Sequence, residues 1–337
     1  MAKQKAHTIR ELAAAAGLSV GAVSYALRGH PSVSPETSRR VRALAEEMGY
    51  QPDPRLTSLM AQIRRSQKPR SREVLAWVWF CPKEEAATPF YSLVFDGARQ
   101  RAERLGCVLE PFWIQDKDIS PHKLHKALRT RGISGVLLSP ANQYEPMTLD
   151  WDWSAFAVAI IGMKEWEPVL HRAGHDYYRS LWRCMQRLNE LKAARPLFLL
   201  DQGMDERLHH MLSAGFRAMH PDQEHAPDLI RLLSPNVPLK ELAMPSALAP
   251  DAVLTTGRLS AWEYEIIHHA LPSVKHWITM NWSAESVAPG ICTRYDLIAG
   301  AAVDLVLAQL HRNERGTPNP AKVVLLEGEW REATSPL

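Results

Sequence analysis

The sequence predicts an all-α head of three short helices, followed by an α/β body of two doubly wound lobes. Capped helical segments follow one another between Thr8 and Tyr50. From residue 73, short apolar runs alternate with segments of helical spacing, which is typical of parallel strands joined by crossover helices. About ten such strands are more than one sheet comfortably holds. We therefore expect two sheets, with a cleft at the carboxyl ends of their strands.

The first two helices of the head have the spacing of a helix-turn-helix. Thr8 can cap the first helix, with Glu11 completing a capping box, and Gly17 ends it. Ser19 then caps a second helix, Val20 to Leu27, after a turn that allows only a steep helix crossing. Because such a second helix presents its first residues to the major groove, the head is predicted to bind DNA sequence-specifically.

A third helix is predicted to complete the core of the head. Ser34 and Pro35 supply its N-cap and its first residue, and the helix runs to Met48. Its apolar face is formed by Val41, Leu44, Ala45 and Met48.

The linker after the head is predicted to begin with a short helix. Pro52 and Pro54 end the third helix and start this one, with Asp53 as N-cap. One side of the segment is apolar, through Leu56, Leu59, Met60 and Ile63. A helix of about ten residues is marginal in water, so it needs a partner helix and DNA, or else it docks on the body as a plain amphipathic linker. The basic residues that follow either touch flanking phosphates or are only solvated: Arg64, Arg65, Lys68, Arg70 and Arg72.

The body alternates strands and helices to its end. The predicted strands cover residues 73–80, 107–114, 133–140, 156–161, 196–200, 229–233, 251–256, 276–280 and 322–330. The predicted helices cover residues 92–106, 120–132, 176–194, about 205–219, about 260–270 and 294–313.

Charge is divided unevenly along the chain. Residues 1–72 contain 13 Lys or Arg and 5 Asp or Glu, a net charge of +8, whereas the remaining residues contain 27 and 32, a net charge of −5. A basic head suits the DNA backbone, because each neutralised phosphate releases condensed counterions.

The sequence shows neither the long apolar segments of a membrane protein nor the cysteine spacing of a disulfide framework. No apolar run approaches the roughly 20 residues of a membrane helix, and no signal peptide precedes the first helix, so a cytoplasmic protein without a membrane partner is expected. The four cysteines, Cys81, Cys107, Cys184 and Cys292, lie far apart and are expected to be buried free thiols.

The sequence contains no catalytic motif in the structural context that such a motif requires. Residues 17–21 read GLSVG, but a nucleophile elbow needs a strand before its serine, and here an alanine-rich helix precedes Ser19. No phosphate-binding loop or zinc-protease motif occurs, and the histidine pairs at 209–210 and 268–269 lack a third spaced ligand. We expect no enzyme activity, metal or cofactor. The alternative is a sugar-binding receptor or enzyme of the two-lobed fold with an incidental DNA-binding head.

The head resembles the lactose-repressor (LacI/GalR) family of bacterial transcription regulators. The residues that carry the resemblance are T-I-x-E-L-A-x-x-A-G-L-S from Thr8, V-S-x-A-L from Val23, V-S-P-E-T-x-x-R-V from Val33 and G-Y-x-P from Gly49. The resemblance implies a ligand-responsive regulator in the bacterial cytoplasm, associated with the nucleoid through DNA, and usually a repressor. It also implies a periplasmic-binding-protein-like body whose chain crosses between the lobes near Gly162, near 282–291 and near Leu325.

These boundaries define the expected domains. They are a head at 1–52, a hinge helix and basic linker at 53–72, and an effector-binding and dimerisation body at 73–337, with an N-lobe at about 73–161 and 292–324 and a C-lobe at about 162–291 and 325–337.

The resemblance also implies which residues contact DNA. Base contacts in the major groove are expected from the second helix and the residue that follows it, and a wedge into the minor groove is expected from the hinge helix. The residues are Val20, Gly21, Tyr25 and Arg28 for the major groove and Leu59 for the wedge. Val20 can meet a thymine methyl, whereas Tyr25 stands where the family more often has arginine. Phosphate contacts are expected from hydroxyl residues at helix starts, which can equally be ordinary caps: Thr8, Ser19, Ser34 and Thr37.

A small metabolite, a sugar or sugar derivative by family frequency, is expected between the lobes. The candidate residues follow strands or open helices: Phe90, Tyr91, Asp176, Arg207, Asn281 and Trp282. Asp176 can equally be a plain N-cap. Asn281 and Leu212 stand where the family often has an aspartate and an arginine, so the pocket is expected to be less polar or built from other residues.

Finally, the resemblance implies a homodimer on a near-palindromic operator. The helix at roughly 92–105 and the segment after residue 276 are expected at its interface. Ligand binding would close or rotate the N-lobes and change the spacing of the paired hinges.

Overall fold

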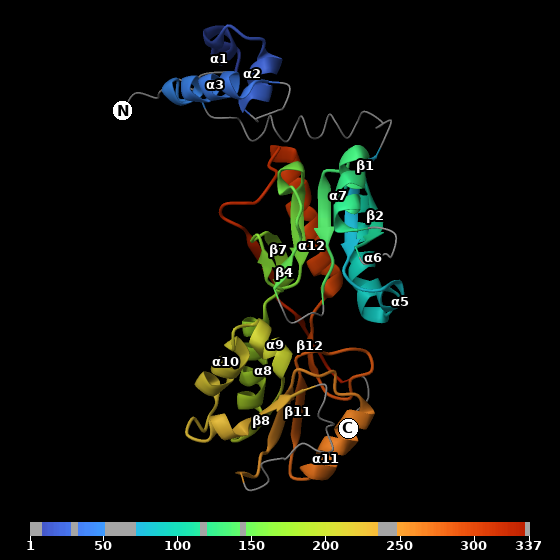
Figure 1. The fold of residues 1–337 in the computed structure, drawn as a ribbon. Helices are drawn as coiled ribbons and strands as arrows, with labels where there is room; N and C mark the ends of the chain where they lie inside the picture. The colour runs from blue at the N-terminus through green and yellow to red at the C-terminus, as the bar shows by residue number, and fades with distance from the viewer. Residues whose placement is uncertain are drawn as a thin grey trace, which may run out of the picture.

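A computed structural model describes residues 9–27, 33–50, 72–114, 120–141, 146–234 and 248–333, which form a three-helix head and two sheets with their covering helices (Figure 1). The predicted linker helix and its basic residues lie outside these ranges. No helix within the ranges is long and apolar enough to cross a lipid bilayer.

The head has the three predicted helices, α1 (Ile9–Ala16), α2 (Val20–Leu27) and α3 (Pro35–Glu47). Gly17 adopts a left-handed φ of +66° where α1 ends. Ser19 Oγ accepts the backbone N–H of Ala22 at 3.1 Å, so the predicted cap of α2 is present. The core of the head is made by its own residues, with Leu12, Val23 and Val41 fully buried.

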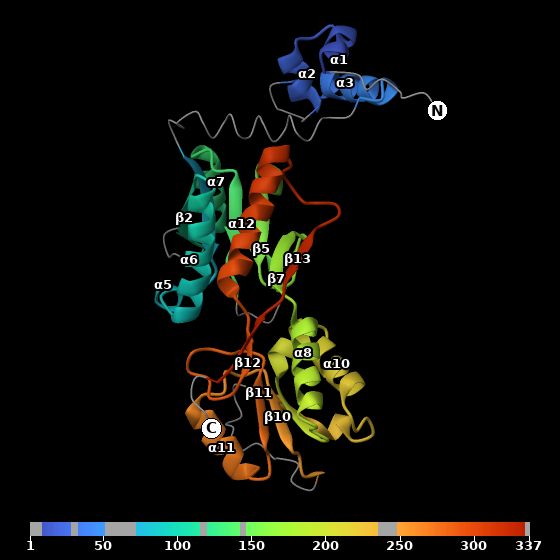
Figure 2. The same cartoon turned by 180° about the vertical axis from the view of Figure 1, so that it is seen from behind.

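The first sheet of the body has six parallel strands in the order β13-β7-β5-β3-β1-β2. Helices α6 and α12 pack against each other on one of its faces, and Figure 2 shows them side by side. In chain order the elements of this lobe are β1 (Glu73–Trp79), α5 (Lys83–Ala86), α6 (Pro89–Arg104), β2 (Cys107–Trp113), α7 (Pro121–Thr130), β3 (Gly135–Leu138), β4 (Met147–Thr148), η1 (Trp153–Ala155), β5 (Ala157–Ile161), β6 (Trp166–Glu167), β7 (His171–His175), α12 (Tyr295–Arg312) and β13 (Val323–Leu326). The short strands β4 and β6 pair separately.

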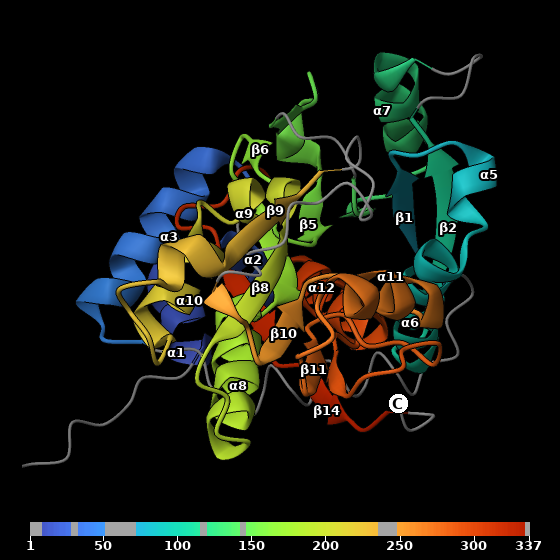
Figure 3. The same cartoon turned by 90° about the horizontal axis from the view of Figure 1, so that it is seen from below.

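The second sheet also has six strands, in the order β14-β12-β11-β10-β8-β9, of which only β14 is antiparallel to its neighbour. Helices α8 and α10 cover one face and α11 lies on the other (Figure 3). The elements are α8 (Tyr177–Glu190), β8 (Pro196–Asp201), α9 (Gln202–Arg207), α10 (Met211–Met219), η2 (Ala226–Leu229), β9 (Ile230–Leu233), β10 (Ala252–Thr255), α11 (Ala261–Ala270), β11 (His276–Thr279), β12 (Gly290–Cys292) and β14 (Glu329–Arg331).

The first crossing between the sheets differs from the expected position near Gly162. At Gly162 the backbone takes a φ of +104°, and the chain then returns to the first sheet as β7, beside β5. It leaves that sheet only after His175. The segment HRAGH of β7 contains three polar residues, so its sequence lacks the apolar run that predicts the other strands.

The other crossings also differ in detail. The single strand predicted over 322–330 is divided between the sheets, because β13 pairs with β7 and β14 pairs with β12. The last crossing therefore lies between Leu326 and Glu329, close to the expected position near Leu325. The middle crossing follows β12, whose Cys292 still belongs to the second sheet.

The helix predicted over about 205–219 is two helices, α9 and α10. His209 and His210 between them have left-handed φ values of 52° and 60°, which interrupt the helix. This break places His209 beside the first lobe, as described below.

The four cysteines are free thiols, and Cys81, Cys107 and Cys184 are buried. Burial raises the pKa of the Cys81 and Cys107 thiols to about 11. These two thiols are therefore protonated near neutral pH and poor nucleophiles.

Candidate functional site

The exposed face of α2 is apolar and uncharged. Val23 and Ala26 are fully buried against the other head helices, which turns Val20, Gly21 and Tyr25 outward. The Val20 and Tyr25 side chains are 42% and 45% exposed. The predicted base-reading positions of α2 thus lie together on one accessible surface.

The hydroxyl residues of the head cap helices. Ser34 Oγ accepts the backbone N–H of Thr37 at 3.2 Å, and the two hydroxyl oxygens lie 2.8 Å apart. Ser19 caps α2 in the same way. Phosphate binding by these hydroxyl groups stays a prediction. The other residues expected to contact DNA lie outside the described residues: Thr8, Arg28 and Leu59.

A second candidate site lies between the lobes, where aromatic residues open three helices. Phe90 of α6 contacts Tyr295, the first residue of α12, with ring centroids 4.9 Å apart. The Tyr295 hydroxyl lies 3.4 Å from the hydroxyl of Tyr177, the first residue of α8. Because α12 packs on the first sheet and α8 on the second, this hydrogen bond joins the two lobes.

Two arginines contribute positive charge near this tyrosine pair. Burial raises the pKa of the Tyr177 phenol, and the charge of Arg207 acts in the opposite direction. Burial likewise raises the pKa of Tyr295, whereas its hydrogen bonds with Tyr177 and Thr293 and the charges of Arg207 and Arg258 lower it. The phenols are therefore neutral donors in a positive environment.

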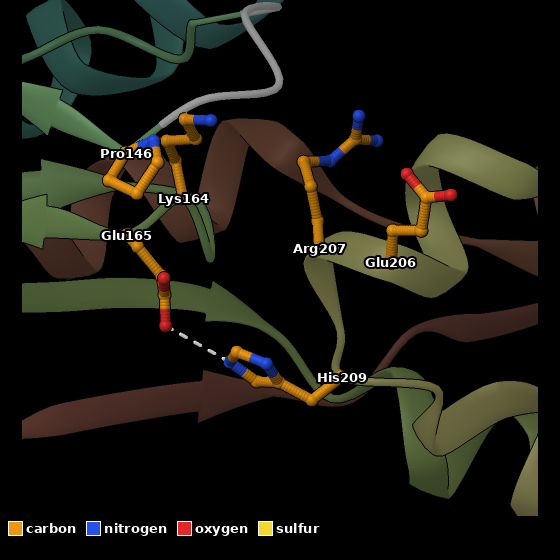
Figure 4. Close-up of a pocket in the computed structure, with 6 residues that line it drawn as sticks. All are labelled: Pro146, Lys164, Glu165, Glu206, Arg207 and His209. Carbon is orange, nitrogen blue, oxygen red and sulfur yellow. Dashed lines mark ion pairs between the residues drawn. The ribbon is translucent and has the colours of Figure 1, made fainter.

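A pocket of about 110 Å³ is lined by both lobes, and its lining includes Arg207, whose charge acts on both tyrosines. Figure 4 shows its lining, which consists of Pro146, Lys164 and Glu165 from the first lobe and Glu206, Arg207 and His209 from the second. Glu165 Oε1 and His209 Nε2 lie 3.0 Å apart and form an ion pair across the lobes when the imidazole is protonated. Lys164 is 7% exposed.

The structure brings only some of the predicted effector residues to this region. Arg207 lines the pocket, and Phe90 contacts Tyr295. Tyr91, 2% exposed, packs in the core of the first lobe against Trp79. Asp176 accepts the backbone N–H of Arg179 at 2.9 Å, which is the N-cap role.

The two predicted residues after β11 have local partners. The Asn281 backbone N–H donates to Thr279 Oγ1 at 2.9 Å. Trp282 Nε1 donates to the carbonyl of Glu332 at 3.1 Å, so this indole is held by the residue that directly follows β14. Neither residue lines the pocket.

Sequence reasoning missed several residues of the site, although part of the signal was present. Tyr177 directly follows the predicted cap Asp176, and Tyr295 lies at the start of the predicted last helix. Helix starts at the carboxyl ends of strands face the cleft in such folds, so both could have been included. His209 had no such signal, because it reaches the pocket through the break between α9 and α10.

Ion pairs and a buried histidine stabilise the chain segments that pass between the lobes. Arg294, with a φ of +53°, binds Asp296 of α12 at 2.8 Å and also pairs with Glu329 of β14. His175 at the end of β7 is 2% exposed, and its Nε2 lies 2.8 Å from Ser180 Oγ. Burial lowers the pKa of His175 to about 4.

Metal chemistry has no support within the described ranges, which contain no group of three His, Cys, Asp or Glu placed to hold an ion.

Comparison with known proteins identifies the head. Residues 8–53 match the model of the bacterial regulatory proteins of the lacI family. No curated protein matches the chain.

Solved structures share the fold of the whole chain or of the body. A transcriptional regulator CelR in complex with cellobiose matches at 16% identity over 98% of this chain and 99% of that one, with a TM-score of 0.54. A transcription-regulator-like protein from Staphylococcus haemolyticus matches at 13% identity over 79% of this chain and 100% of that one, with a TM-score of 0.50. A putative LacI transcriptional regulator from Bacillus cereus subsp. cytotoxis NVH 391-98 matches at 14% identity over 78% and 98%, also with a TM-score of 0.50.

The helix-turn-helix head and the two-lobed α/β body are thus both as the sequence predicted. The N-terminal domain of the chain is therefore a domain of the lacI family of bacterial regulatory proteins.

Proposed function

We propose that this protein is a transcription regulator, most simply a repressor, which binds a near-palindromic operator as a homodimer and responds to a small effector between its lobes. The observation that carries the proposal is the lacI-family head with its accessible α2 face. The excess of 13 basic over 5 acidic residues in positions 1–72 supports phosphate binding.

The proposed base readout is dominated by apolar contacts. Val20 and Tyr25 are the large exposed side chains of α2, and the helix has no charged residue. Apolar side chains recognise the C5-methyl group of thymine in the major groove. We therefore propose A·T pairs opposite the start of α2, with Arg28 and Leu59 as further contacts.

The proposed effector response uses the interlobe pocket. A ligand that touches both walls binds one arrangement of the lobes more tightly than another, and only that difference can shift the equilibrium. A coupling of about 1–3 kcal/mol alters DNA affinity some 5–150-fold, which is enough for control. The fold relative described with cellobiose supports a small polar metabolite as effector.

The proposed readout of DNA predicts a specific effect of Val20→Ala. We expect the full-length protein to enrich a near-palindromic duplex from random sequence, and Val20→Ala to weaken that complex about tenfold, the lower range for one base contact. Because the charge is unchanged, affinity for bulk DNA should stay the same. Fluorescence anisotropy at fixed salt measures both affinities.

Val323→Ala is the matched control, since Val323 is 51% exposed on β13 and lies in the body. It should leave both affinities unchanged. A wild-type protein that prefers no symmetric duplex over genomic fragments would contradict the proposed function itself.

The proposed dimer places the outer surface of α6 at the interface. Leu93 on α6 is 49% exposed, and Leu297 of the packed helix α12 is 47% exposed. Exposed large apolar side chains mark a protein–protein interface when they form a patch. We expect Leu93→Asp to convert a dimer into a monomer at micromolar concentration, as measured by sedimentation velocity.

Leu232→Asp is the control, because Leu232 is also 49% exposed but lies on the edge strand β9 of the other sheet. If both variants sediment like the wild type, the α6 surface is not the interface.

A further inference from the structure

We propose that contacts between the two lobes hold the interlobe cleft closed in the absence of ligand, so that an effector has to break them before it binds. The main contact is the hydrogen bond between the hydroxyls of Tyr177 and Tyr295, and the pair formed by Glu165 and His209 supports it. We call these two contacts the clasp. This inference rests on the proposed function, because it concerns how the effector site is regulated.

The cleft is smaller than an ordinary ligand site. The pocket that both lobes line measures about 110 Å³, whereas small-molecule pockets measure about 300–1,000 Å³. Its walls also touch: Glu165 Oε1 of the first lobe and His209 Nε2 of the second lie 3.0 Å apart, and Figure 4 marks this contact. A metabolite of ordinary size therefore requires the lobes to move apart.

The tyrosine pair links the position of one lobe to that of the other. The Tyr177 ring packs against the hydrophobic core of the second lobe, and the Tyr295 ring packs against that of the first. Phe90 holds the Tyr295 ring edge to face, with an angle of 84° between the ring planes. Because each ring is anchored in its own lobe, a movement of the lobes changes the distance between the two hydroxyls.

The hydroxyl contact is sheltered but easily broken. Both tyrosines are partly buried, and a hydrogen bond away from water is electrostatically stronger than an exposed one. Its oxygen–oxygen distance of 3.4 Å is at the long end for such a bond, so a small separation of the lobes is enough to lose it. These are the properties of a reversible contact between moving parts.

The second contact of the clasp is weaker. The Glu165 and His209 side chains are 54% and 75% exposed, and exposed ion pairs contribute little to stability. We therefore assign the larger share of the closure to the tyrosines.

Closure by the protein's own side chains has a consequence of definite sign. The apparent affinity of a ligand is lowered in proportion to the fraction of molecules whose site is open. Loss of the clasp therefore increases effector affinity, whereas loss of a residue that contacts the effector decreases it. The clasp sets the effector concentration at which the regulator responds.

The test measures the arrangement of the lobes without ligand or DNA. Spin labels are attached at Lys126→Cys on α7 and Arg217→Cys on α10, both exposed, in full-length protein in which the half-buried Cys292 is replaced by serine. Double electron–electron resonance gives the distribution of distances between the labels. We expect one narrow distribution, which Tyr177→Phe shifts and broadens.

A second tyrosine variant tests the hydrogen bond itself. Tyr295→Phe should produce the same change as Tyr177→Phe, and the two together should add little, because each removes the same bond. Thermal unfolding confirms that each variant is folded, and Tyr295→Phe serves alone if Tyr177→Phe is not. Tyr178→Phe is the matched control, since Tyr178 is the next residue and 47% exposed, and it should leave the distribution unchanged.

The histidine contact has a matched control in the neighbouring residue. His209→Asn shortens the side chain that reaches Glu165 and should broaden the distribution less than Tyr177→Phe does. His210→Asn should have no effect, because His210 Nδ1 contacts Asp205 of its own lobe at 3.1 Å. Asparagine suits both positions, since both have left-handed backbones.

The outcomes separate the clasp from the proposed function. A parent protein whose distribution is already broad, or one that neither tyrosine variant changes, overturns the clasp. The same shift in Tyr178→Phe overturns its assignment to the hydrogen bond. Selection of a near-palindromic duplex would still support the regulator in each case. Conversely, a narrow distribution that either tyrosine variant broadens establishes the clasp even if no duplex is preferred.

Discussion

Gly97→Ala is expected to destabilise the first lobe by about 2 kcal/mol and to lower its Tm by about 5 °C. A Cβ at this position of α6 would lie 2.7 Å from the carbonyl carbon of Asp296 and closer still to its oxygen. These are backbone atoms at the start of α12, so relief requires α6 and α12 to move apart. The clash outweighs the roughly 1 kcal/mol that alanine gains over glycine within a helix. Calorimetric unfolding measures the change.

The expected displacement also reaches the interlobe site, because Tyr295 is adjacent to Asp296 and Phe90 belongs to α6. Gly300→Ala is the control, since it makes the same change on α12 in the same helix pair. Its Cβ would meet Arg101 Cβ at 3.5 Å, an ordinary contact, so stability should be unchanged or slightly higher. Equal stability of the two variants would contradict the close packing of these helices.

Acid is expected to remove about 3 kcal/mol of stability through His175 alone. Its pKa of about 4 in the folded protein is below the ordinary value of 6.5, because burial disfavours the imidazolium. Above pH 6.5 both folded and unfolded chains hold it neutral. As the pH falls from 6.5 to 4, the unfolded chain takes up a proton that the folded chain excludes, so stability declines. Urea unfolding at pH 7 and pH 4.5 measures the difference.

His175→Gln isolates this effect, because it removes the titration while other groups respond to pH as before. We expect a smaller loss of stability between pH 7 and pH 4.5 in this variant than in the wild type. His225→Gln should not reduce the loss, since a hydrogen bond with Asp222 raises the pKa of His225. Identical pH dependence in wild type and His175→Gln would rule out the buried neutral imidazole.

The head could be predicted almost residue by residue because its signals are local. Gly17, Ser19 and Ser34 are caps or stops that act within one helical turn, and the structure uses Ser19 and Ser34 as expected. The apolar face of α3 follows from helical spacing alone, and Val41 is fully buried as that spacing predicts.

The lobe boundaries could not be predicted as well, because they depend on pairing between distant segments. In β7, His171 and His175 are buried although the strand reads as polar. Residues 322–330 are predicted as one strand, yet the partners of its two halves belong to different sheets. Nothing within either segment specifies those partners.

The interlobe site, too, could be predicted from the sequence only where local signals mark its residues. Positions at helix starts identified Phe90 and Asp176, but not which helix starts meet across the lobes. The contact between Tyr177 and Tyr295 joins residues 118 positions apart in the chain. Lys164 and His209 depend on a loop and on a helix break whose geometry the sequence does not specify.

The placement of β13 and β14 makes each lobe discontinuous in the chain. A protease that cuts only between His175 and Tyr177 severs one of three covalent connections, because the chain also passes between the sheets after β12 and after β13. The two fragments should therefore co-purify under native conditions and separate only in denaturant. Genetic excision of either half would, by contrast, remove a strand from the sheet of the other lobe, so a continuous piece of the chain is not expected to fold as one complete lobe.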